Sequence, residues 1–188
     1  MKQVLSLITI LLLTASVSFA QEKKLGEDEP FVPTAEELAK YLPELKAGDA
    51  APALAAPDTL GNIVSLDGYR GSYVIIDFWA TWCGDCRREI PALKKLYAQW
   101  PNDDTRVWVS VSFDHKKDDW TKLLRKEQFP WLQLSNGKPW KENPIAKQWD
   151  LHWIPTFFII DPQGRIAASA ITAEELGKKL QEIGQNGK

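Results

Sequence analysis

The stretch YVIIDFWATWCGDC, residues 73–86, decides the fold and holds both cysteines of the 188-residue chain. Residues 73–79 form a short apolar run, which is typical of a buried central strand. A helix is predicted from about residue 84 to 99, so Cys83 lies at or just before its N-terminus. The stretch therefore predicts a strand that turns directly into a helix, with the cysteines at the junction.

The pattern on either side of this junction is also α/β. Further apolar runs and a hairpin partner predict strands over residues 106–112, 156–160 and 165–170. Amphipathic segments predict helices over residues 114–128, 144–149 and 172–183. Residues 129–141, rich in Pro, Gly and Trp, are predicted to be a loop, and residues 50–66 to be short extended pieces. The predicted fold class is α/β, a central mixed sheet flanked by helices.

The N-terminus has the pattern of a secretory signal peptide. Lys2 precedes an apolar run over residues 4–13, and small residues follow up to Ala20. The apolar centre is shorter than the roughly 20 residues of a membrane span, so cleavage after about Ala20 is favoured over an uncleaved anchor helix. Export to the periplasm follows, with contact to the membrane only if the segment is not cleaved.

The remaining chain divides into two parts. Residues 21–47 are polar and interrupted by prolines, with a short helix predicted from Thr34 to about Leu42, and we interpret them as an N-terminal extension. Residues 48–188 would form the α/β domain. The net charge is −2 with no dominant basic patch, which argues against nucleic acid as a partner.

The two cysteines are poorly placed for a structural staple. Disulfides persist outside the cytoplasm, but a bridge between Cys83 and Cys86 would close a very small ring and constrain little of the unfolded chain. At a helix N-terminus, unpaired N–H groups and the helix dipole stabilise an anion, so we expect a lowered pKa for the Cys83 thiol. Cys86, one turn further, could resolve a mixed disulfide formed by Cys83.

Three other uses of the thiols were weighed. A zinc site needs about four ligands, and the chain offers two cysteines and two histidines that are not spaced as a pair. A copper site could combine the two thiols with His152. A peroxidase cysteine would need an activating Thr and Arg constellation, and no convincing one is visible. A redox dithiol at a βα junction is favoured over all three.

Residues 75–86 resemble the active-site segment of the thioredoxin superfamily. The resemblance extends over about residues 48–184, and further matching features occur in the expected order, namely Gly71, Pro91, the sequence WIPT at 153–156 and the turn DPQG at 161–164. The signal peptide and the segment between residues 113 and 153 resemble the exported TlpA/ResA-like branch. The predicted fold is accordingly thioredoxin-like.

The resemblance implies roles for four further residues. Pro155 matches the cis-proline that lies against the nucleophilic cysteine, and the backbone of Ile154 would pair with the bound substrate chain. Asp77, a carboxylate inside an apolar strand, would have a raised pKa and accept the proton of Cys86. Glu89 matches an active-site glutamate of ResA-like proteins, with a surface position as the alternative.

Residues beside the cysteines are expected to tune or extend the site. Trp82 and, next to Pro155, Trp153 are candidates for an apolar surface that faces the substrate. Gly84 and Asp85 lie between the cysteines, and Asp85 stands where thioredoxin itself has proline. Because its carboxylate would repel a thiolate, we predict that Asp85→Pro or Asp85→Asn lowers the pKa of Cys83 in a thiolate titration.

The predicted function is an exported thiol-disulfide oxidoreductase that reduces protein disulfides through Cys83 and Cys86. No metal is expected, and the redox-active Cys83–Cys86 disulfide takes the place of a cofactor. By resemblance, electrons would come from a membrane thiol transporter, and apocytochrome c, in cytochrome c maturation, is one candidate substrate. The alternatives are the copper-binding module and a domain that mainly binds a partner through residues 21–47.

Overall fold

A five-stranded mixed sheet of order β5-β4-β3-β6-β7 forms the centre of the computed structural model of the chain. The structure describes residues 34, 36 and 40–186. The predicted signal peptide at 1–20 lies outside the described residues. Of the short helix predicted from Thr34 to about Leu42, the structure describes residues 34, 36 and 40–42, and residues 36, 40 and 41 are helical. Within the described ranges, no helix combines the length and apolar character needed to cross a membrane.

The central strand β3 carries the chain into the cysteine site. It pairs in parallel with β4 and antiparallel with β6, so both of its edges are covered. The strands of this sheet are β3 (Tyr73–Trp79), β4 (Arg106–Ser112), β5 (Leu132–Ser135), β6 (Thr156–Ile160) and β7 (Ile166–Ala170). A separate antiparallel pair is formed by β1 (Ala55–Pro57) and β2 (Ile63–Ser65). The mixed sheet of the predicted fold class is confirmed.

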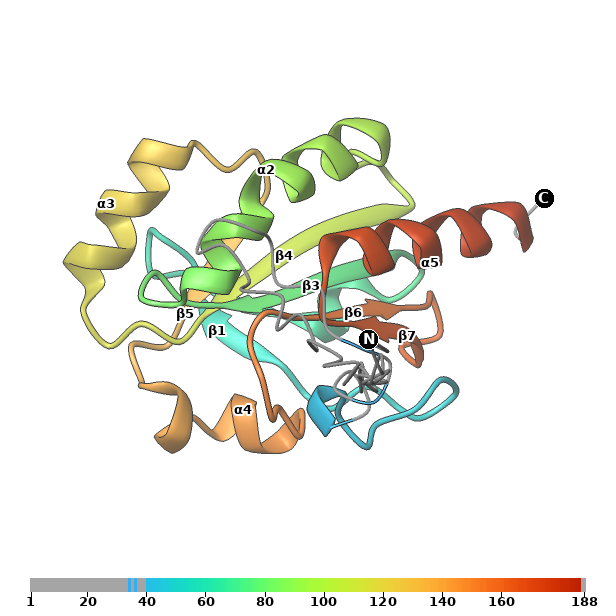
Figure 1. Cartoon of the computed structure of the whole chain (residues 1–188), viewed down its shortest axis with the longest axis horizontal. Coiled ribbons are helices and arrows are strands. Elements are labelled where there is room, and N and C mark those ends of the chain that lie inside the picture. The colour runs from blue at the N-terminus through green and yellow to red at the C-terminus, as the bar shows by residue number, and fades with distance from the viewer. Residues whose placement is uncertain (1–33, 35, 37–39, 187–188) are drawn as a thin grey trace, which may run out of the picture. The chain divides into compact units, whose positions relative to one another are not determined.

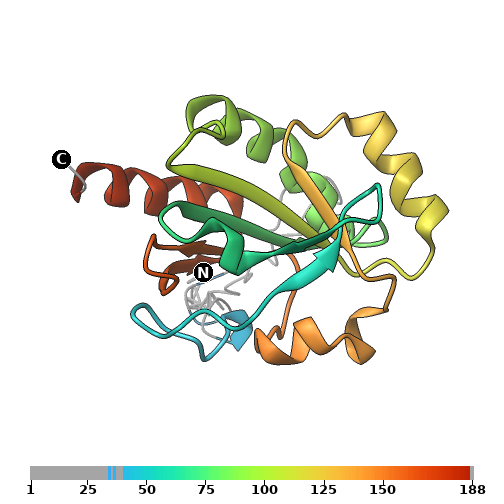
Figure 2. The same ribbon diagram turned by 180° about the vertical axis from the view of Figure 1, so that it is seen from behind.

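Helices cover both faces of the sheet. The α-helices are α2 (Gly84–Gln99), α3 (Lys117–Glu127), α4 (Pro144–Gln148) and α5 (Ala173–Asn186), and short 3-10 helices span Leu66–Tyr69 and Trp140–Glu142. In Figure 1, α2 and α5 lie above the sheet and α4 lies below it, and Figure 2 shows the same arrangement from behind.

Each face of the sheet has its own apolar core. Because side chains alternate along a strand, Ile75 points to one face and Ile76 to the other. Ile75 belongs to a cluster with Leu93 of α2 and Leu176 of α5. Ile76 belongs to a cluster that includes Ile145 of α4. Because both faces of β3 are buried, nearly all of its side chains are apolar, which explains the continuous apolar run in the sequence.

Two predicted boundaries were wrong. The segment 129–141 is not all loop, because Leu132–Ser135 pairs in parallel with β4 as strand β5. The helix predicted from Asp114 begins only at Lys117, because the side chain of Asp114 is bonded to Thr81 and Ser112 outside any helix. The other predicted strands and helices are present with boundaries within about three residues of those expected.

Candidate active site at the end of strand β3

Cys83 and Cys86 form a disulfide at the N-terminus of α2. Both residues are buried, with Cys83 7% and Cys86 2% exposed, so Cys83 is the more accessible of the two. The chain reaches this point through a tight turn in which the Cys83 N–H donates to the Ala80 carbonyl at 3.2 Å. The greater burial of Cys86 was predicted, and the roles of attacking and resolving cysteine remain predictions.

Cys83 is the N-cap residue of α2. Its sulfur accepts a hydrogen bond from the Cys86 N–H at 3.0 Å. A thiolate formed there on reduction would receive the same N–H bond together with the positive end of the helix dipole. Both interactions favour the anion, which is the reactive form of a thiol.

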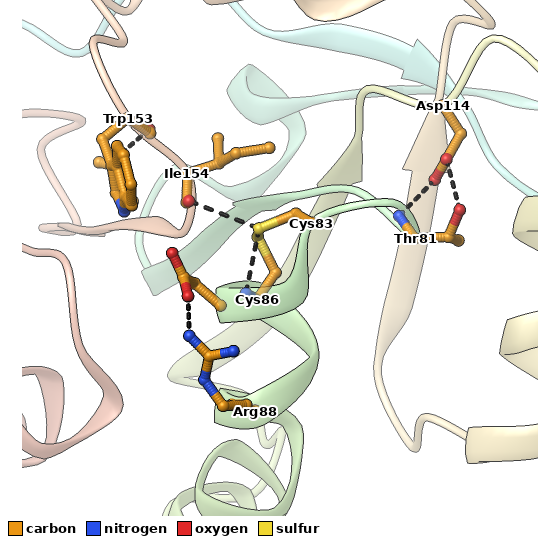
Figure 3. The surroundings of a disulfide bond; sticks show 9 residues. Thr81, Cys83, Cys86, Arg88, Asp114, Trp153 and Ile154 are labelled. Atoms are coloured by element: carbon orange, nitrogen blue, oxygen red, sulfur yellow. Dashed lines mark hydrogen bonds and ion pairs between the residues drawn. A yellow bond between two sulfur atoms is a disulfide. The ribbon is translucent and has the colours of Figure 1, made fainter. Parts of the chain in front are cut away.

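The loop before β6 lies directly against Cys83. The Ile154–Pro155 peptide bond is cis, as predicted, and Pro155 is buried. The carbonyl oxygen of Ile154 lies 3.5 Å from the Cys83 sulfur (Figure 3). The backbone of Ile154 is therefore placed beside the atom at which a substrate sulfur would arrive.

Asp77 is a buried carboxylate on β3, 4% exposed. The Ser110 hydroxyl, opposite Asp77 on β4, donates to its Oδ2 at 2.8 Å, and the Trp131 indole N–H donates to that hydroxyl oxygen at 2.8 Å. The Oδ1 atom has no hydrogen-bond partner among the described residues. Burial, with a smaller contribution from the charge of Glu89, raises the pKa of Asp77 to about 7. The predicted rise is confirmed.

Glu89 is partly buried and joins two helices. Its Oε2 accepts a hydrogen bond from the Ala173 N–H at 2.9 Å, at the start of α5. Burial raises the pKa of Glu89, and the Ala173 bond partly opposes that rise. Because Glu89 is only partly exposed and its charge also acts on Asp77, it is not a simple surface residue, and its role at the dithiol remains a prediction. Its contact with α5 was not predicted.

Aromatic side chains flank the cysteines on two sides. Trp82 is 52% exposed, and its ring stacks near that of Trp140, with centroids 6.5 Å apart. Trp153 packs on Tyr41 from the N-terminal extension, with centroids 4.6 Å apart. The structure thus adds Trp140 and Tyr41 to the two tryptophans that the sequence singled out.

The two residues between the cysteines lie in the first turn of α2. Gly84 begins the helix, and Asp85 forms an ion pair with Arg88 one turn later. The positive charge of Arg88 therefore partly neutralises the Asp85 carboxylate that we expected to act on Cys83. The effect of Asp85 on the pKa of Cys83 remains a prediction, and this pairing reduces its expected size.

The structure does not bring His152 to the thiols as part of a ligand set. Among the described residues, no three His, Cys, Asp or Glu side chains gather as a metal site would require. His152 instead lies 3.2 Å from the carboxylate of Asp150, at the surface. This arrangement gives the copper-binding alternative no support.

Sequence reasoning missed three residues near the site, Thr81, Ser110 and Asp114. Thr81 lies in the turn before Cys83 and is hydrogen-bonded to the buried Asp114, two residues after the end of β4 (Figure 3). Two signals could have identified these residues. Ser110 interrupts an apolar strand, and Asp114 follows a strand predicted to neighbour β3, where carboxyl ends of parallel strands meet.

Comparisons with known proteins agree on the family and the fold. A family model described as the AhpC/TSA family matches residues 47–169. Thiol-disulfide oxidoreductase ResA of Oceanobacillus iheyensis is 28% identical over 184 residues, covering 93% of this chain and 85% of that protein.

Solved structures give the same result. The thioredoxin domain of a thiol-disulfide oxidoreductase from Bacteroides vulgatus is 30% identical with a TM-score of 0.68, covering 74% of this chain and 99% of that one. A thiol:disulfide interchange protein DsbE from Chlorobium tepidum is 27% identical with a TM-score of 0.65, covering 74% of this chain and 98% of that one.

Proposed function

The chain belongs to the AhpC/TSA family, and from this we propose that it is a thiol-disulfide oxidoreductase that reduces disulfide bonds of exported proteins. The resemblance to ResA-like proteins found in the sequence is borne out by these relatives. One observation carries the proposal: the Cys83 sulfur accepts the N–H bond that opens α2 and lies 3.5 Å from the Ile154 carbonyl.

The reaction follows from the two sulfurs. In the reduced protein the Cys83 thiolate attacks one sulfur of a substrate disulfide, and the substrate S–S bond breaks as a mixed disulfide forms. The departing substrate thiolate takes up a proton. Cys86, once deprotonated, then attacks the Cys83 sulfur and releases the second substrate thiol. Two electrons pass to the substrate, and the Cys83–Cys86 disulfide remains.

Asp77 is suited to receive the proton of Cys86. A base works best when its pKa lies near the working pH, and burial places that of Asp77 at about 7. Its Oδ1, which has no hydrogen-bond partner in the described part of the chain, leaves room for one more hydrogen bond. Glu89, whose charge acts on Asp77, would adjust this transfer.

The cellular setting rests on the N-terminal sequence and the relatives. Residues 1–20 have the pattern of a cleaved signal peptide, so the domain would act in the periplasm on exported proteins. A membrane thiol donor would restore the reduced dithiol after each turnover. Substrates would include disulfide-bonded apocytochrome c.

Insulin reduction together with a redox titration tests the proposal. The wild-type protein should speed precipitation of the insulin B chain in the presence of a thiol reductant, whereas Cys83→Ser should not. A reductant of exported proteins should have a potential below about −200 mV, and a value near −120 mV would indicate an oxidant. Absence of any exchange would remove the proposed function.

A further inference from the structure

Asp114 is a buried carboxylate that the mechanism above does not use. It is 4% exposed and lies two residues after the end of β4. Three hydrogen bonds satisfy it. The Thr81 hydroxyl donates to Oδ1 at 2.6 Å, the Thr81 N–H donates to Oδ2 at 3.0 Å, and the Ser112 hydroxyl donates to Oδ2 at 2.7 Å. A buried carboxylate is costly unless it is bonded in this way, so these contacts form a tightly determined unit.

The unit fixes the turn that delivers Cys83. Both donors of Thr81 go to the same carboxylate, and Thr81 lies only two residues before Cys83. On the other side, Ser112 accepts the Asp114 N–H at 3.0 Å, and the Phe113 N–H donates to the Trp79 carbonyl at 2.9 Å. The end of β4 therefore restrains the loop that leaves β3, and we call the contacts of Asp114 with Thr81 and Ser112 the clamp. Figure 3 shows Thr81 and Asp114 on one side of Cys83 and Ile154 on the other.

The clamp matters most in the reduced protein. In the disulfide form, the bond to Cys86 holds the Cys83 sulfur over the helix N-terminus. Once that bond is broken, the sulfur stays near the Cys86 N–H only if the backbone before Cys83 is held in place. The contact that stabilises the attacking thiolate then depends on the turn at residues 80–82, which Asp114 restrains.

We propose that Asp114 is a positioning residue that, through Thr81, holds the Cys83 thiolate at the N-terminus of α2 for attack on a disulfide. The inference rests on the proposed function for its biological use. The step it serves is the first one, in which the Cys83 sulfur bonds to a substrate sulfur and the substrate disulfide breaks. Asp114 neither touches the substrate nor takes a proton.

Isosteric variants isolate the clamp. Thr81→Val keeps the shape and the N–H of Thr81 but loses the hydroxyl donor, whereas Thr81→Ser keeps both donors. Asp114→Leu removes both acceptor oxygens. Asp114→Asn replaces the carboxylate with an uncharged amide, whose oxygen and NH2 group can still hydrogen-bond Thr81 and Ser112. The control Asp58→Leu removes an exposed carboxylate that also accepts three bonds, in the turn at residues 58–62.

Two quantities are measured. The first is the rate at which iodoacetamide alkylates Cys83 in the reduced protein, and the second is the equilibrium constant between the dithiol and disulfide forms of the protein in glutathione buffers. We expect Thr81→Val and Asp114→Leu to slow alkylation about tenfold, because misplacement of a reacting atom costs that much or more. The same variants should shift the equilibrium about threefold toward the protein disulfide. The reason is that the contact between the Cys83 sulfur and the Cys86 N–H would be weakened only in the reduced state, where no disulfide holds the sulfur in place. Thr81→Ser, Asp114→Asn and Asp58→Leu should stay within about twofold of wild type.

A purely structural role would lower the unfolding midpoint without moving the glutathione equilibrium, and that result would overturn the inference. So would a Thr81→Val protein with wild-type alkylation and equilibrium. If Asp114→Leu fails to fold, the two Thr81 variants decide the question alone. Alkylation needs no protein substrate, so a wild-type protein that lacks exchange activity contradicts the proposed function and leaves this test intact.

Discussion

At the scale of single residues, the site combines a cysteine at a helix N-terminus with a buried carboxylate. Under the proposed function Cys83 would gain its reactivity from the α2 N-terminus, whereas burial on β3 raises the pKa of Asp77 to about 7. The two effects are separate in origin, because one comes from the backbone of a helix and the other from loss of water. Variants can therefore separate attack by Cys83 from deprotonation of Cys86.

We predict that Asp77→Asn slows resolution of the mixed disulfide and removes its pH dependence near 7. The Asp77 carboxylate can accept a proton, whereas the amide of the variant cannot. The wild-type rate should therefore fall as the pH drops through about 7, because the carboxylate becomes protonated there. Stopped-flow measurement of product release across this range is the direct assay. Equal rates and equal pH profiles for the two proteins would rule out the role.

Stability gives an independent check on the same residue. The pKa of Asp77 is raised in the folded protein, so its stabilising contribution is complete below about pH 4 and is lost as the pH rises through about 7. Asp77→Asn should therefore stabilise the fold relative to wild type at pH 8 by up to ~4 kcal/mol, and much less at pH 4. Urea unfolding at both pH values measures the difference.

At the scale of elements, Glu89 links the active-site helix α2 to the C-terminal helix α5. It accepts the Ala173 N–H, one of the donors left unpaired at the start of α5. Glu89→Ala should lower the unfolding free energy by about 1 kcal/mol, and Glu89→Gln, which keeps an oxygen acceptor, by less than half of that. Urea unfolding with Glu182→Ala, an exposed change on α5, as control would test this. Equal losses for Gln and Ala would contradict it.

Sequence patterns predicted most elements because most are long enough to show their periodicity. The runs at 73–79 and 106–112 match β3 and β4 residue for residue. Strand β5 was not predicted because a segment of four residues, LQLS, is too short to show a pattern. Only its pairing with β4 makes it a strand. The start of α3 was misplaced because Asp114 serves a tertiary contact that no local pattern reveals.

At the scale of the whole molecule, two aromatic pairs join residues that lie beside the dithiol and the Pro155 loop to more remote parts of the chain. Trp82 stacks with Trp140, and Trp153 packs on Tyr41. We expect this surface to favour apolar side chains next to the substrate disulfide. Trp140→Ala should reduce the ratio of kcat/KM for phenylalanine-flanked over glycine-flanked disulfide peptides by about threefold to tenfold.

The control for that measurement is Leu60→Ala, which removes an apolar side chain that is 85% exposed, from the turn before β2. An unchanged peptide preference in Trp140→Ala would show that the tryptophan pair takes no part in recognition. A loss of preference in Leu60→Ala as well would point to a general effect of surface apolar residues.

The site was predictable where its residues are close in sequence and only partly so elsewhere. Cys83 and Cys86 were identified from their spacing together with their place at a predicted βα junction, whereas Pro155 and Ile154 came from resemblance. The partnership of Ser110 with Asp77 depends on the parallel register of β3 and β4, and that of Thr81 with Asp114 depends on two strands ending at one edge. Register and edge alignment are tertiary facts, so the sequence could only suggest them.

The central claim is that Cys83 attacks and Cys86 resolves, and trapping tests it most directly. Reduced Cys86→Ser is mixed with a disulfide-bonded peptide, and the product is digested and analysed by mass spectrometry without reductant. The account predicts a stable mixed disulfide on Cys83, while reduced Cys83→Ser forms none at a comparable rate because its remaining thiol, on Cys86, is more deeply buried (2% against 7% exposed). A peptide attached preferentially to Cys86, or to neither cysteine, would contradict it.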